Sequence, residues 1–141
     1  MNDLVGNFKT MPGFLRLLTL LSLMSILLLA ATFFSGGAVV GQKRVGLEKW
    51  WLNGSGPIFT VAVCVFFSAG IMLLKARRLG RLTYISGFAG LYVASYFIEL
   101  INGVSYSRDD YAYDLLFAAL QVTALIAYLF FNRRVKNFLV T

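Results

Sequence analysis

One carboxylate lies inside a long apolar run of this sequence, and it is the residue best placed to do chemistry. Glu99 is the only charged residue in the run 82–101. An ionisable group inside a hydrocarbon layer is costly and usually marks an ion site, a proton path or a buried pair. At roughly 100° per residue in a helix, Phe88, Tyr92 and Glu99 fall within about 20° of one line. Tyr96 lies beside that line, so the sequence predicts a tyrosine–glutamate face.

Two interpretations of this face stay open. In the first, Glu99 is structural, because it pairs with Arg108 or accepts a hydrogen bond from a tyrosine. In the second, it binds a proton or another cation. The last apolar run carries a second polar stripe, since Asp114, Gln121 and Tyr128 are seven residues apart and share one helical face. Gln121 therefore joins the candidate contacts.

An acidic segment precedes this last run. Asp109 and Asp110 lie in the stretch 102–114, which ends with Asp114. Acidic side chains are typical of a helix N-terminus, where they face the positive end of the helix dipole. The alternative is a site for a cation or a basic partner. The spacing of a calcium loop is not present.

The chain that must position these groups is too apolar for a water-soluble domain. Of its 141 residues, 59% are hydrophobic and 13% are charged, whereas a soluble domain is about 25% charged. The apolar residues form four runs of about 17–20 residues, each long enough as a helix to cross a hydrocarbon core of about 30 Å. We expect an all-α integral membrane protein, a single domain over 1–141, built as an antiparallel bundle of four transmembrane helices at about 17–34, 57–74, 82–101 and 115–131.

The basic residues set the expected orientation. Nine of the thirteen cations flank one side of the four runs, and the side richer in Lys and Arg faces the cytoplasm. We therefore expect both termini in the cytoplasm. The basic side chains could also bind anionic lipid headgroups, although topology alone explains them. The candidates for headgroup contact are Lys75, Arg77, Arg78, Arg81, Arg133, Arg134 and Lys136.

The longer outer loop, 35–56, contains adjacent tryptophans. Trp50 and Trp51 suit the membrane–water boundary, where an apolar ring with one N–H is favourable. We interpret them as interfacial anchors, with a docking patch for an outside partner as the alternative.

Several classes of function lack the residues they need. The chain has no histidine and one cysteine, so neither a His-based metal site nor an internal disulfide is expected. No nucleophile–base pair or phosphate-binding loop is present, and we expect no cofactor and no enzyme activity. Nucleic-acid binding is not expected either, because no soluble basic face is predicted.

The C-terminal stretch carries a resemblance. It reads Leu115-Leu116-Phe117, then 123–128 as Thr-Ala-Leu-Ile-Ala-Tyr, then 133–138 as Arg-Arg-Val-Lys-Asn-Phe. This stretch resembles the last span and the Arg-Val-Lys-x-x-Phe-like tail of a family of small four-span bacterial inner-membrane proteins. The resemblance covers the final 27 residues and otherwise only the layout. It implies fold and location rather than a mechanism.

We expect a non-enzymatic membrane protein that acts by protein–protein contact, as an accessory subunit of a membrane complex or an immunity-type protein. The partner would be a membrane or periplasmic protein, or a second copy of the chain. The alternative is a small oligomeric transporter or channel that uses Glu99 and the neighbouring tyrosines. A lipid-modifying enzyme is a third possibility, with only the acids and tyrosines for acid–base work.

Overall fold

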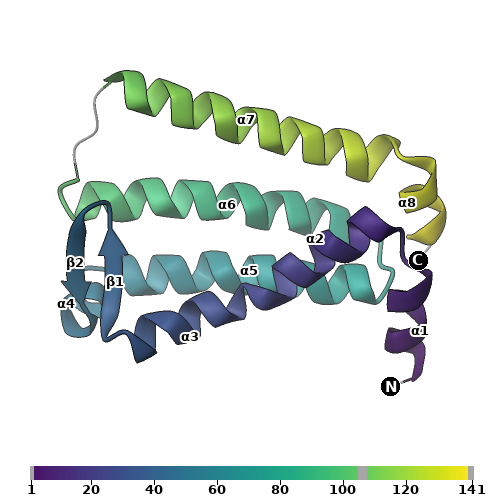
Figure 1. Ribbon diagram of the computed structural model, residues 1–141, viewed down its shortest axis with the longest axis horizontal. Helices are drawn as coiled ribbons and strands as arrows, with labels where there is room; N and C mark the ends of the chain where they lie inside the picture. Colours follow the sequence, from purple (N-terminus) through teal and green to yellow (C-terminus); the bar gives the residue numbers. More distant parts are fainter. Residues whose placement is uncertain (1, 105–107, 140–141) are drawn as a thin grey trace.

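The structure is a computed structural model that describes residues 2–104 and 108–139 (Figure 1). Within this part of the chain, four helical segments are long and apolar enough to cross a membrane, with mean hydropathy between 1.4 and 2.4. This confirms the prediction of a helical protein with four apolar segments that could span a membrane. The first segment joins α2 and α3, and the others are single helices: α2 (Gly13–Met24), α3 (Ile26–Phe34), α5 (Ser55–Leu74), α6 (Leu79–Ile101) and α7 (Arg108–Phe131).

The last spanning helix begins earlier than the sequence predicts. We expected the helix from about 115, whereas α7 begins at Arg108. Acidic residues at 109 and 110 favour a helix start there, because they complement the positive end of the helix dipole. Asp114 therefore lies on the helix and not in a loop.

The first span is interrupted at Ser25. The hydroxyl of Ser25 donates to the carbonyl of Ser22 at 2.7 Å, and the Ser25 N–H bonds to the same carbonyl, three residues back. Serine that bonds back to its own helix commonly bends it. The hydroxyl of Ser22 is directed to a neighbouring helix, where it donates to the carbonyl of Phe66 on α5.

Glycines allow α5 and α6 to approach closely. A Cβ on Gly87 of α6 would lie 2.7 Å from the Cα of Phe66 on α5, which is nearer than real Cβ contacts. Gly70 similarly receives Ser22 and Leu23 of the first span. Small residues at such crossings let helix backbones pack directly in a membrane. The main core lies in the half of the molecule near the connection between α5 and α6. It includes Leu15, Leu73, Tyr84 and Leu129.

A tight turn joins α5 to α6. Ala76 adopts a left-handed conformation with φ of 54°, and its N–H bonds to Leu73 while that of Arg77 bonds to Met72. This pair of hydrogen bonds is the Schellman pattern that ends many helices. The turn lies beside two short helices, α1 (Asn2–Thr10) and α8 (Arg133–Phe138), and we call this the basic end (Figure 1).

A small β-hairpin with a short helix covers the opposite end, which we call the hairpin end. β1 (Gly37–Val40) pairs antiparallel with β2 (Lys43–Gly46), and α4 (Leu47–Leu52) follows. The sequence predicts a loop over 35–56, whereas the structure forms a hairpin and a short helix there. Gly41, with φ of 59°, opens the two-residue connection between the strands, where such a conformation favours glycine.

The helix α7 lies apart from the rest (Figure 1). Of its apolar stretch, 11% is buried, against 33% for α5. It contacts α6, and at the basic end the ring of Tyr128 meets Phe14 of α2 edge-on at 4.7 Å. The four spans are therefore not equal members of a closed bundle.

Substitution of Gly87 tests the α5–α6 crossing. Gly87→Ala should lower the unfolding free energy in detergent by about 1–3 kcal/mol, because the added methyl group overpacks the contact with Phe66. Gly90→Ala is the matched control, because a Cβ at Gly90 meets nothing within 4 Å. Equal stability of the two variants would contradict the crossing. Chemical or thermal denaturation followed by circular dichroism measures both.

Candidate functional site

The predicted tyrosine–glutamate face of α6 is turned toward α7. The hydroxyl of Tyr92 donates to the side-chain oxygen of Gln121 on α7 at 2.5 Å. Phe88 lies one turn away, with its ring centroid 5.5 Å from that of Tyr92. Two stripes that the sequence placed on different helices are thus joined by a hydrogen bond.

A second contact follows toward the hairpin end. The rings of Tyr96 on α6 and Tyr111 on α7 meet edge-on, with centroids 5.5 Å apart. Glu99 lies within electrostatic reach of Tyr111 and is half-buried. Of the predicted contact residues, Tyr92, Tyr96, Glu99 and Gln121 therefore gather between the same two helices.

The three predicted aspartates, Asp109, Asp110 and Asp114, do not add a described contact to this cluster. Asp114 lies on α7 with an exposed side chain. The side chains of Asp109 and Asp110 lie outside the described residues. Within the described part of the chain, no three or more His, Cys, Asp or Glu side chains are grouped so that they could hold a metal ion.

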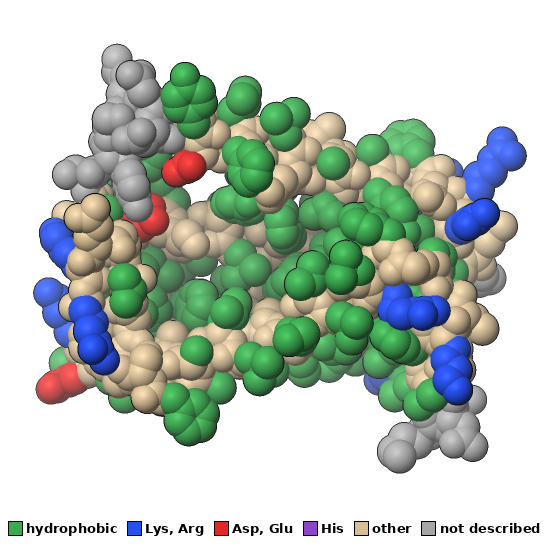
Figure 2. Space-filling model, in the orientation of Figure 1, with side chains coloured by type: hydrophobic (Ala, Val, Ile, Leu, Met, Phe, Trp, Pro, Cys, Tyr) green, Lys and Arg blue, Asp and Glu red, His purple; other side chains and the backbone are tan. Residues whose placement is uncertain are grey.

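The polar contacts between α6 and α7 lie beside an opening. Tyr92 is 37% exposed and Tyr96 is 45% exposed. Figure 2 shows the surface hollowed between α7 and the helices beside it. The same view shows Lys and Arg side chains at the two ends of the molecule and an apolar middle. The two tyrosines of this polar stripe are therefore accessible from outside the helix bundle.

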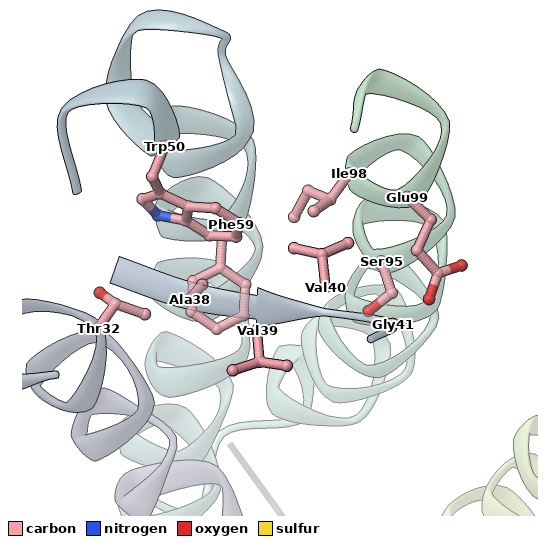
Figure 3. A pocket seen from close by; sticks show the side chains of 10 residues that line it. All are labelled: Thr32, Ala38, Val39, Val40, Gly41, Trp50, Phe59, Ser95, Ile98 and Glu99. Atoms are coloured by element: carbon pink, nitrogen blue, oxygen red, sulfur yellow. The ribbon is translucent and has the colours of Figure 1, made fainter. Parts of the chain in front are cut away.

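A separate cavity of about 180 Å³ lies under the hairpin. Trp50, Phe59 and Val40 form apolar walls, while Ser95 and Glu99 of α6 supply polar atoms at one side (Figure 3). The carboxylate of Glu99 points away from Trp50 and Phe59. The cavity is mainly apolar, with its polar side at α6.

The two tryptophans have different surroundings. Trp50 is 3% exposed and packs edge-on against Phe59, so its ring is enclosed by the protein. Trp51 is half-buried, with its ring centroid 5.7 Å from that of Phe33. Ala38 pairs with Val45 in the hairpin, but neither strand has the alternating apolar pattern that would have signalled this covered site in the sequence.

Polar contacts hold the hairpin end over α5 and α6. The amide of Asn102 donates to the hydroxyl of Ser55 at 3.0 Å, and the amide of Asn53 donates to Asn102 at 3.0 Å. Lys43 donates to the carbonyl of Gly103 at 3.0 Å. These bonds connect the segment 35–56 to the ends of α5 and α6 nearest the hairpin, and thereby position the cavity.

The predicted headgroup residues lie at the basic end. Arg81 differs from the others because it is half-buried, with its guanidinium carbon 5.9 Å from the ring centroid of Phe130. The rest have exposed side chains: Lys75, Arg77, Arg78, Arg133, Arg134 and Lys136.

Comparison with known proteins finds no matching family, no matching curated protein and no matching solved structure. The resemblance of the C-terminal stretch to the small four-span family stays a prediction.

Proposed function

We propose that this protein acts by binding a membrane helix of another protein along the open side of α7. It would serve as an accessory subunit of a membrane complex or as an immunity-type protein. The observation that carries the proposal is the hydrogen-bonded pair of Tyr92 and Gln121, which joins α6 to the least buried span, α7.

The polar pair matters more than the exposed apolar surface. Lipid tails cover apolar side chains as well as another helix does, so an exposed leucine favours no partner. A tyrosine hydroxyl and an amide in the apolar belt keep further hydrogen-bonding capacity that lipid tails cannot satisfy. A helix with small or polar side chains could approach Tyr92 and Gln121 closely and use that capacity.

Photo-crosslinking from α7 tests this proposal. Phe117 is 59% exposed and lies about 40° from Gln121 around the helix. A photoreactive phenylalanine analogue at this position should give a protein adduct in native membranes. The same analogue at Val61 of α5, which is 64% exposed, is the matched control and should give none.

The mass of the adduct identifies the class of partner. The chain has a mass of 15.7 kDa. If the mass that the adduct adds to the chain differs from this value, the partner is a different protein. An adduct of twice the chain mass instead indicates a homo-oligomer. Lipid adducts alone, or equal protein adducts from both positions, would contradict the proposed binding face.

We also propose that the basic end faces the cytoplasm of a bacterial cell, in the inner membrane. The support for the orientation is the bias of nine cations to that side, and the support for the bacterial inner membrane is the resemblance of the C-terminal stretch to the small four-span family. Peptide tags at the two termini should both be digested by protease in inverted membrane vesicles and both be protected in right-side-out vesicles. Digestion of the tags from opposite sides would refute this topology.

A second candidate function is transport of protons or another cation through Glu99. It is favoured by one observation, that Glu99 and Ser95 border the cavity under the hairpin. In this case liposomes that contain the protein should take up protons down a gradient, as reported by an internal pH-sensitive dye. Glu99→Gln should reduce the flux to that of empty liposomes, because the amide does not ionise.

Glu48→Gln is the control for this experiment, because Glu48 is exposed on α4. It should leave the flux unchanged. Absence of flux from the unmodified protein, or equal loss in both variants, would eliminate the transport function.

A further inference from the structure

Arg81 begins the same face of α6 that ends with Glu99. At roughly 100° per residue, Arg81, Phe88 and Glu99 fall within about 20° of one line, which is the face turned toward α7. Gly80 is buried against α5, since a Cβ there would lie 3.0 Å from the backbone nitrogen of Leu73. This close contact fixes the first turn of α6, and with it the position of Arg81.

The guanidinium group of Arg81 lies beside an aromatic ring and a second cation. Its Nε atom is enclosed and has no hydrogen-bond partner among the described residues. The ring of Phe130 lies on one side, and Arg78 lies near enough to repel its charge. An enclosed donor without an acceptor is unfavourable, and a nearby like charge adds to the cost.

No acidic side chain that the structure describes lies near Arg81. The described acids are Glu48, Glu99 and Asp114, which lie on α4, on the last turn of α6 and near the start of α7, toward the hairpin end. Arg16 at the basic end also has an enclosed Nε without a partner among the described residues, but one of its terminal nitrogens donates to the carbonyls of Lys9 and Met11. Arg81 makes no such bond to the described residues.

We propose that Arg81, with Arg78 beside it, binds the phosphate group of an anionic phospholipid. A guanidinium presents its N–H groups as a planar fork, and two oxygens of one phosphate can accept from its two terminal nitrogens together. Arg81 lies in the first turn of a spanning helix, which is the depth of lipid headgroups. Basic sites between spanning helices are known to hold such headgroups.

This site is separate from the proposed partner face. It lies at the basic end of α6 and α7, whereas Tyr92, Tyr96 and Glu99 lie farther along toward the hairpin end. The phosphate proposal therefore stands whether or not a partner helix binds.

Thermal unfolding of the full chain in a neutral detergent tests the site. Phosphatidylglycerol at saturation should raise the midpoint by about 3–4 °C more than phosphatidylcholine, because a ligand that binds only the folded state stabilises it. Inorganic phosphate at the same concentration should give no comparable shift. An equal shift with phosphatidylcholine, or with inorganic phosphate, would overturn the proposal.

Variants separate a specific site from the general basic charge. Arg81→Gln should abolish the difference between the two lipids, and Arg81→Lys should keep less than half of it, since an ammonium lacks the fork. Arg133→Gln removes the same charge from an exposed position and should keep the full difference. Equal loss in Arg81→Gln and Arg133→Gln would show a diffuse field and overturn the site.

Native mass spectrometry gives a readout that does not depend on thermal stability. The unmodified chain and Arg133→Gln should retain one bound phosphatidylglycerol, whereas Arg81→Gln should retain none. Circular dichroism in phosphatidylcholine checks that each variant is folded. Retention of the lipid by folded Arg81→Gln would overturn the proposal.

Discussion

Three of the spanning helices meet at the backbone of Phe66. The hydroxyl of Ser22 donates to its carbonyl, and Gly87 lies against its Cα. The aromatic ring packs against Tyr84 with a centroid distance of 5.0 Å. Lipid supplies no hydrophobic drive for helix association, so close backbone packing and hydrogen bonds must hold the helices together. The positions of α2, α5 and α6 depend on this meeting point.

The fourth spanning helix is outside that meeting point, and the functional proposals follow from this difference. At the basic end α7 contributes Leu129 to the main core. Toward the hairpin end its contacts with α6 are made by tyrosines and Gln121. A helix held firmly at one end and by a few polar groups along the rest leaves room for another helix beside it. The phosphate proposal uses the firmly packed end, and the partner proposal uses the open part.

The sequence predicts the spans and the polar stripe, because both depend on the composition and residue spacing of a single helix. An apolar run of sufficient length must form a helix in lipid, and the spacing from Tyr92 to Glu99 fixes their common face. The separation of α7 could not be predicted in this way. Leucines that face lipid and leucines that face protein have the same chemistry, so the usual contrast between surface and core is lost. The burial of Trp50 depends on the hairpin, whose strand pairs join residues that lie up to nine positions apart, such as Gly37 and Gly46.

At the turn that contains Ala76, helix packing determines the backbone conformation against the local preference of the residue. A left-handed backbone costs an alanine about 1 kcal/mol relative to a glycine, which adopts it freely. The hydrogen bonds from Ala76 and Arg77 back to α5, together with the close packing of Gly80 and Gly87, offset that cost. The local preference of the chain is thus overruled by the docking of two helices. If α5 and α6 were separated, the packing of Gly80 and Gly87 would no longer offset the cost of the left-handed conformation at Ala76. The turn would then relax into right-handed backbone.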